Sequence, residues 1–95
     1  MVSFIARFRF PSEDRAEVLE AVRQLVADSR KEPGCLTYIP AHPEADPDTL
    51  LILEQYADEK ALAAHRDSEH YKKYCVAVLF QKMKDREIEN LVALG

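Results

Sequence analysis

The 95-residue sequence lacks most of the features that mark exported, membrane or disulfide-linked proteins. Its two cysteines, Cys35 and Cys75, are far apart and fit no CxxC or Cys/His ligand spacing, so we expect reduced, packed thiols. No apolar run approaches the roughly 18 residues that a membrane span needs. The first residues show neither the basic region nor the cleavage pattern of a secretory signal. We therefore predict a cytoplasmic protein with no membrane partner.

A concentrated patch of positive charge is also missing. The net charge is -4, and the basic residues are scattered among acids. A nucleic-acid surface needs clustered lysines and arginines, and the pairs Arg30-Lys31 and Lys72-Lys73 are too short to form one. We predict no nucleic-acid partner. Repeats and low-complexity segments are absent, and the length suits one small domain, so we expect a single domain over residues 1–95.

What the chain does contain is a clear alternation of strand and helix patterns. Residues 2–10 alternate apolar and polar side chains with period two, and Pro11 ends the run. Ser12 is a good N-cap for a helix whose apolar stripe recurs with helical spacing. The predicted elements are a strand at 2–10, a helix from Ser12 to about Arg30, strands at 35–39 and 49–56, helical segments starting at Asp58 and Ser68, and a closing strand at 85–94.

This order predicts an α+β fold with the ferredoxin-like arrangement β-α-β-β-α-β, in which helices cover one face of an antiparallel sheet. The strand at 49–56 is apolar on both faces, with Leu50 and Ile52 on one side and Leu51 and Leu53 on the other. One layer of helices covers only one of these faces. We therefore expect a homodimer in which a second copy of the sheet covers the other face.

Three motifs link the chain to a known family. They are Glu32-Pro33-Gly34-Cys35-Leu36-Thr37-Tyr38, Glu54-Gln55-Tyr56-Ala57-Asp58 and Leu62-Ala63-Ala64-His65-Arg66-Asp67-Ser68-Glu69-His70-Tyr71. With these motifs, nearly the whole chain resembles the antibiotic biosynthesis monooxygenase family. The resemblance implies a dimeric α+β barrel with a pocket between sheet and helices in each subunit. It also implies oxidation of quinols or anthrones by molecular oxygen without metal, flavin or haem.

That reaction requires removal of a proton from the substrate, since a deprotonated phenol or enol is electron-rich enough to react with dioxygen. Histidine titrates near neutrality, and His65 matches the histidine of the family's helix motif, so we take it as the candidate catalytic base. Tyr56, Tyr71, His70 and Tyr38 are candidate substrate-binding residues that can hydrogen-bond to an aromatic ligand or stack on it. The alternative is that these five side chains serve only as core or capping residues.

Glu54 and the histidine pair carry two further expectations. Glu54 lies on an otherwise apolar strand, and a buried carboxylate needs a partner, so we expect an ion pair with Arg7 or Arg9 or else a role facing the substrate. His65 and His70 are five residues apart, off the i, i+4 spacing of one helix face, and the break at Ser68 separates them. We therefore expect no metal site.

Other activities of this family fit less well or stay open. The haem-degrading branch relies on an asparagine in its first strand and on a tryptophan and a histidine on its helices, whereas this chain has no tryptophan and no asparagine in its first strand. An isomerase branch acts on a phosphorylated, sugar-like signalling molecule and needs a cationic phosphate site, for which Arg7, Arg9 or Arg66 are the candidates. A dimeric ligand-binding or stress-response protein without turnover is the third alternative.

Overall fold

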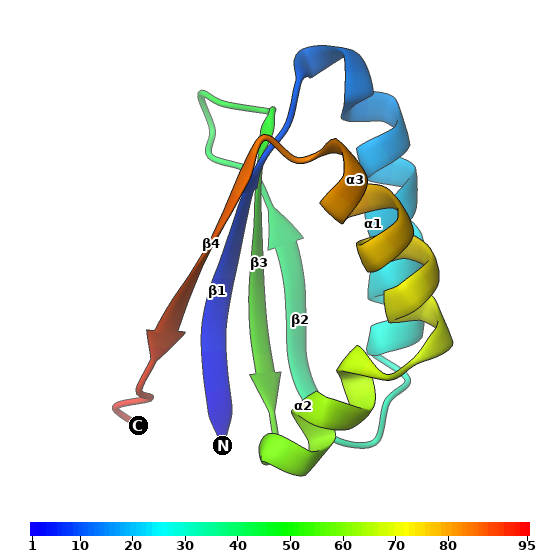
Figure 1. Cartoon of the computed structure of the whole chain (residues 1–95). Coiled ribbons are helices and arrows are strands. Elements are labelled where there is room, and N and C mark those ends of the chain that lie inside the picture. The colour runs from blue at the N-terminus through cyan, green and yellow to red at the C-terminus, as the bar shows by residue number, and fades with distance from the viewer.

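The computed structural model describes residues 1–95 and shows one four-stranded antiparallel sheet with all helices on one of its faces (Figure 1). The strands are β1 (Val2–Arg9), β2 (Cys35–Ala41), β3 (Thr49–Tyr56) and β4 (Asp85–Leu91), in the sheet order β2-β3-β1-β4. The helical segments are η1 (Ser12–Asp14), α1 (Arg15–Ser29), α2 (Glu59–Arg66), the π-helical η2 (Tyr71–Leu79) and α3 (Phe80–Lys82). The predicted α+β, ferredoxin-like order is confirmed. No helix has the length and hydropathy needed to cross a membrane.

The strand pattern of β1 sets which side chains face the helices. Phe4, Ala6 and Phe8 are buried on the helix side. In the register with β3 they pair with Glu54, Ile52 and Leu50 respectively. Because side chains alternate along a strand, residues directly opposite each other in neighbouring strands share a face. Glu54 therefore points into the layer between sheet and helices.

The helices contribute the other half of the core. The buried residues of α1 are Val18, Ala21, Val22, Leu25 and Ser29, which is the predicted apolar stripe with Ala21 added and Val26 half-buried. From η2, Cys75 and Leu79 are buried against the same core. Figure 1 shows α1 and η2 with α3 side by side over the sheet, while α2 lies across one end. The site described below forms at that end.

Three predicted strand ends are wrong: β1 ends at Arg9, one residue before the predicted end, and the ends of β2 and β4 differ for reasons of pairing. Strand β2 continues through Pro40 to Ala41, beyond the predicted end at residue 39. It is an edge strand, where a proline removes no essential donor. Strand β4 ends at Leu91, which pairs with Ser3 near the start of β1, and so Val92 and Leu94 lie exposed outside the sheet.

The turn before β2 packs tightly against α2. Gly34 has no side chain, and a Cβ added there would lie 2.4 Å from the Cβ of Ala61 on α2. The Ala57 N–H donates to the Gly34 carbonyl at 2.9 Å. The predicted start of α2 at Asp58 is confirmed, since Asp58 is its N-cap and its Oδ1 accepts from the Ala61 N–H at 2.8 Å. This contact holds the segment that carries Glu32 against α2.

Candidate functional site

Helix α2 delivers His65 into the interior. Leu62 and His65 are its buried residues, and they lie three positions apart on one face of the helix. Ser68 then joins α2 to η2, because its Oγ donates to the His65 carbonyl at 2.6 Å and accepts from the Tyr71 N–H at 3.2 Å. At the predicted break, Ser68 thus links the end of α2, which carries His65, to the start of η2.

All five candidate residues meet around the imidazole of His65. Its ring centroid lies 5.1 Å from that of Tyr56, 5.2 Å from Tyr71, 5.8 Å from Tyr38 and 5.9 Å from His70. His65 is only 2% exposed, and Tyr38 and Tyr56 are buried as well. Residues from β2, β3, α2 and the start of η2 therefore form a single aromatic cluster.

Glu32 orients this cluster and was not among the residues predicted for the site. Its Oε2 lies 2.8 Å from His65 Nδ1 and 2.5 Å from His70 Nε2. An ionised carboxylate can only accept hydrogen bonds, so both of these nitrogens donate to it. His65 is thereby held as the tautomer with hydrogen on Nδ1 and a lone pair on Nε2.

Glu54 is the second carboxylate of the site. It is buried on β3, and the Tyr56 hydroxyl donates to its Oε1 at 2.6 Å. The same oxygen is 3.8 Å from His65 Nε2, beyond hydrogen-bonding distance. Nδ1 of His65 thus faces Glu32, while Nε2 faces Glu54 and the cavity described below.

The prediction that Glu54 forms an ion pair with Arg7 or Arg9 is wrong. Both arginines alternate with the buried residues of β1 and therefore lie on the sheet face opposite the helices. Arg9 pairs instead with Asp85 of β4. Glu54 has Tyr56 and His65 as its nearest polar neighbours and shares its cavity with Arg66 and Arg86, so it faces the interior of the candidate site.

Burial determines the protonation behaviour of the cluster. It raises the pKa of Glu54 from its ordinary value to about 7, although the Tyr56 hydrogen bond acts in the opposite direction. It lowers the pKa of His65, and the hydrogen bond that His65 donates to Glu32 opposes this effect. Burial also raises the pKa of the Tyr38 and Tyr56 hydroxyls, so both stay protonated near neutrality. His65 and Glu54 are therefore the groups suited to exchanging protons at neutral pH.

A small cavity of about 20 Å³ lies between this cluster and β1, with room for about one water molecule. Its lining combines apolar side chains with Glu54, His65 and two arginines, and consists of Phe4, Ala6, Phe8, Tyr38, Ile52, Glu54, His65, Arg66, Tyr71, Cys75 and Arg86. Of the candidate residues, His65, Tyr71 and Tyr38 line it directly. Tyr56 and His70 contact His65 from outside the lining.

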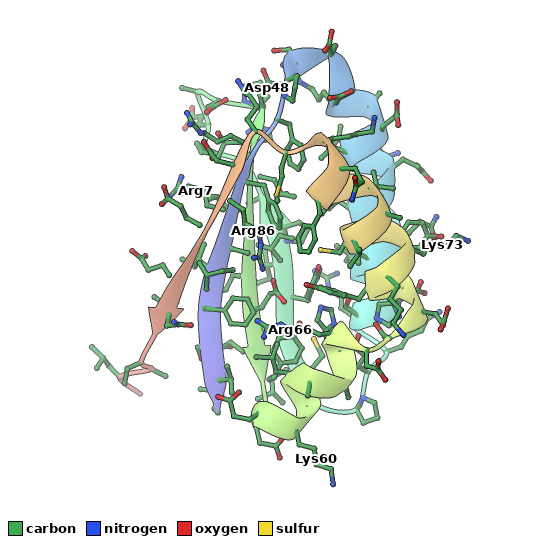
Figure 2. The ribbon with its side chains drawn as sticks, viewed as in Figure 1. Arg7, Asp48, Lys60, Arg66, Lys73 and Arg86 are labelled. Carbon is green, nitrogen blue, oxygen red and sulfur yellow. The ribbon has the colours of Figure 1, made fainter.

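Two arginines mark the polar edge of the cavity. Figure 2 shows Arg66 on α2 and Arg86 on β4 in the space between the sheet and the helices. The Arg86 guanidinium lies 5.6 Å from the Phe8 ring centroid and 5.0 Å from that of Phe80, within the range of cation–π attraction. Both arginines are exposed at the residue level, so this edge meets solvent. Arg86 was missed because its predicted strand carried no recognisable motif.

A larger hollow of about 390 Å³ lies elsewhere, between α1 and the β2–β3 turn. Its walls are mainly apolar residues such as Val18, Leu19 and Pro47. Its charged residues include Arg15 and Asp48, which pair with each other at 2.8 Å. The acid and base groups whose pKa burial shifts lie around His65 instead, and we place the candidate site there.

Comparison with known families agrees with the fold and with the motifs around His65. The family model described as antibiotic biosynthesis monooxygenase matches residues 1–77. The chain belongs to the antibiotic biosynthesis monooxygenase family. The matched range runs from β1 into η2 and includes Glu32, Glu54, His65 and His70.

Relatives of known structure extend the agreement to the whole fold of this family. A crystal structure of an antibiotic biosynthesis monooxygenase superposes with a TM-score of 0.92 at 28% identity, over 100% of both chains. PA3566 from Pseudomonas aeruginosa superposes with a TM-score of 0.90 at 26% identity, over 99% of this chain and 94% of its own. The Mycobacterium tuberculosis protein named "Putative monooxygenase Rv0793" is 36% identical over 74 residues, covering 77% of this chain and 71% of its own length. The family therefore supports a monooxygenase-like function.

Proposed function

We propose that this protein is a cofactor-independent monooxygenase that oxidises a quinol- or anthrone-like aromatic substrate with molecular oxygen. The observation that carries this proposal is the environment of His65. Its Nδ1 is fixed by Glu32 at 2.8 Å, and its Nε2 faces a cavity walled by Tyr71, Tyr38 and apolar side chains. A neutral imidazole held in this orientation is suited to removing a proton from a bound phenol or enol.

The reaction needs no other electron source than the substrate. His65 Nε2 takes a proton from the substrate, and the resulting carbanion or phenolate transfers an electron to dioxygen. Recombination forms the new C–O bond and cleavage of the O–O bond follows. For an anthrone-type CH₂ group, one oxygen atom becomes the new C=O and the other leaves as water with the two hydrogens of that carbon. The four electrons that reduce dioxygen all come from the substrate.

The other residues of the site bind and stabilise the substrate in this proposal. Tyr71 and Tyr38 offer aromatic faces for stacking, and Tyr56 and His70 hold the base from behind. Arg66 and Arg86 bring positive charge to the polar edge, where it stabilises the anion left by proton removal. The cavity is too small for an aromatic ring system as it stands, so substrate entry requires the exposed arginine side chains to move aside.

We also propose that the working unit is a cytoplasmic homodimer of one-domain chains spanning residues 1–95. The sheet face without helices carries Ile5, Leu51 and Leu53, which are only half-buried. Ile39 on the same face is 49% exposed. Apolar side chains in adjacent strands form a surface that a second copy of the same sheet covers by the hydrophobic effect.

Oxygen uptake by the metal-stripped protein tests the proposal. We expect uptake above the autoxidation background with reduced naphthoquinols or anthrones, and its loss in His65→Ala. His42→Ala is the matched control, since His42 is exposed in a loop away from the site. Because a buried histidine is removed, circular dichroism should confirm that the variant is folded, and His65→Gln serves as a more conservative second variant. Uptake unchanged in both His65 variants would contradict the assignment of the base.

Isomerisation of a small phosphorylated metabolite is the second candidate function. Arg66 and Arg86 at the polar edge favour it, because they can bind a phosphate group beside His65. Arg7 and Arg9 do not contribute, since they lie on the other face of the sheet. Turnover that consumes no oxygen would favour the isomerase, and a ligand retained through purification without turnover would favour a binding protein.

A further inference from the structure

The side of His65 that faces away from the cavity forms a second cluster of potential metal ligands. His65 Nδ1, His70 Nε2 and a Glu32 carboxylate oxygen all lie within 4.8 Å of one another. They come from three segments: the turn before β2, helix α2 and the residue that precedes η2. The sequence spacing of the two histidines argued against a metal site, but it could not take account of Glu32, which the fold inserts between them.

The geometry of these atoms is close to that of a coordination sphere. Zinc binds imidazole nitrogen and carboxylate oxygen at about 2.0–2.2 Å in a tetrahedral arrangement, which places its ligand atoms roughly 3.3 Å apart. Glu32 Oε2 is 2.8 Å from His65 Nδ1 and 2.5 Å from His70 Nε2. Movements of less than about 1 Å would open these two separations to those of a metal site, while the two histidine nitrogens, which lie within 4.8 Å of each other, would have to close to roughly 3.3 Å.

We propose that Glu32, His65 and His70 form a binding site for a divalent transition-metal ion of the zinc type. Two imidazoles and one carboxylate suit zinc and its neighbours in the first transition row, whereas Mg²⁺ and Ca²⁺ prefer oxygen ligands alone. The side chains of Glu32 and His70 are each 16% exposed and that of His65 is 3% exposed. An ion therefore reaches the site from the solvent side, and three protein ligands leave a position for water.

Occupation of this site changes the tautomer of His65. In the hydrogen-bonded cluster, Nδ1 carries the hydrogen and Nε2 has the lone pair. A metal ion uses the lone pair of Nδ1, so the hydrogen of the neutral imidazole moves to Nε2, and no net proton is released. Nε2 then donates toward the cavity instead of accepting. The metal ion thus acts as an inhibitor of a reaction that needs Nε2 as a base; this consequence alone rests on the proposed function.

Calorimetric titration of the chelator-treated full chain with ZnCl₂ tests the site itself. We expect one zinc ion per chain and no comparable binding of MgCl₂. Removing a residue that only hydrogen-bonds to a metal ligand typically lowers metal affinity about tenfold to a hundredfold. His70→Ala and Glu32→Gln change proposed ligands themselves, so each should weaken zinc binding by at least about tenfold. His42→Ala, which removes the exposed loop histidine, should bind like the wild type. Circular dichroism of each variant controls for folding.

Co²⁺ supplies a second measurement that does not depend on activity. Bound by this ligand set, Co²⁺ should give visible d–d absorption. Added zinc should displace the Co²⁺ ion and abolish this absorption, and the His70→Ala variant should not show it. Equal zinc binding by the wild type and His70→Ala, or weakening by His42→Ala alone, would overturn the site. If zinc binds as expected but oxygen uptake is absent with or without a chelator, the metal site stands and the monooxygenase proposal fails. Uptake that is unaffected by bound zinc would overturn the inhibition.

Discussion

His65 turns its two ring nitrogens toward two different carboxylates, with Nδ1 2.8 Å from Glu32 and Nε2 3.8 Å from Glu54. The first distance is a hydrogen bond and the second is not. Glu32 can therefore fix the tautomer of the imidazole, while the gap on the other side leaves Nε2 available to a substrate. This asymmetry is the arrangement that the proposed role of His65 as a base requires.

Glu32→Gln tests the positioning role of the first carboxylate. The amide keeps the shape of the side chain but removes the negative charge that stabilises His65 once it has taken a proton. We expect kcat for oxygen uptake to fall roughly tenfold to a hundredfold with little change in KM, and the pH–rate profile to shift. Glu59→Gln, at an exposed position in the first turn of α2, is the matched control. Equal kcat and an unchanged pH profile in Glu32→Gln would rule out this role.

Glu54→Gln tests how much the buried charge of the second carboxylate, Glu54, destabilises the folded protein. Burial raises the pKa of Glu54 in the folded protein from 4.5 to about 7. The folded state thus binds more protons than the unfolded state between these values, and stability present below pH 4.5 is lost as pH rises through about 7. The loss should be on the order of 3 kcal/mol in the free energy of unfolding.

Urea unfolding at pH 5 and pH 8 measures this effect. The glutamine variant cannot ionise at this position, so its free energy of unfolding should fall less between the two pH values than that of the wild type. The Tyr56 hydroxyl can still donate to the amide oxygen, and the comparison therefore isolates the charge. Parallel pH dependences in the two proteins would show that Glu54 titrates normally.

Gly34→Ala tests the contact that holds the Glu32 segment against α2. The added Cβ would lie 2.4 Å from the Cβ of Ala61, so one of the two backbone segments must move. Overpacking of this kind typically costs about 1–3 kcal/mol. We expect a lower melting temperature and, because α2 carries His65, a lower activity as well. Gly95→Ala has no atom within 4 Å of its added Cβ and should match the wild type. A melting temperature unchanged by Gly34→Ala would indicate that the turn yields freely.

The fold was predictable from the sequence because its signals are local. The alternation at residues 2–10 and the stripe of α1 require only the chain itself, and the motifs that carry the family resemblance include Glu32, Glu54 and His65. What a one-dimensional pattern could not give is the pairing of side chains from distant segments. Glu32 and His65 are 33 positions apart and meet only because Gly34 packs on Ala61.

Glu54 is a second residue whose partners could not be predicted from the sequence alone. Its charge on an apolar strand is visible in the sequence, and a buried acid predicts an arginine partner on the neighbouring strand. The register places Phe4 opposite Glu54, and the arginines of β1 fall on the other face. A shift of one residue in register would have reversed this outcome, and the strand at 49–56, which is apolar on both faces, does not by itself indicate which of its residues face the helices.

Leu53→Lys tests the proposed homodimer, because Leu53 lies at the centre of an apolar row on the helix-free face. In the sheet register it pairs with Ile5 on one side and with Ile39 on the other. A lysine there would bury an unpaired charge between two sheets, which a dimer interface does not tolerate. Light scattering should show a dimer for the wild type and a folded monomer for the variant. Leu19→Lys replaces an exposed leucine on α1, far from this face, and should remain dimeric. A monomeric wild type, or a Leu53→Lys variant that stays dimeric, would mean that two copies of the chain do not associate through their sheets.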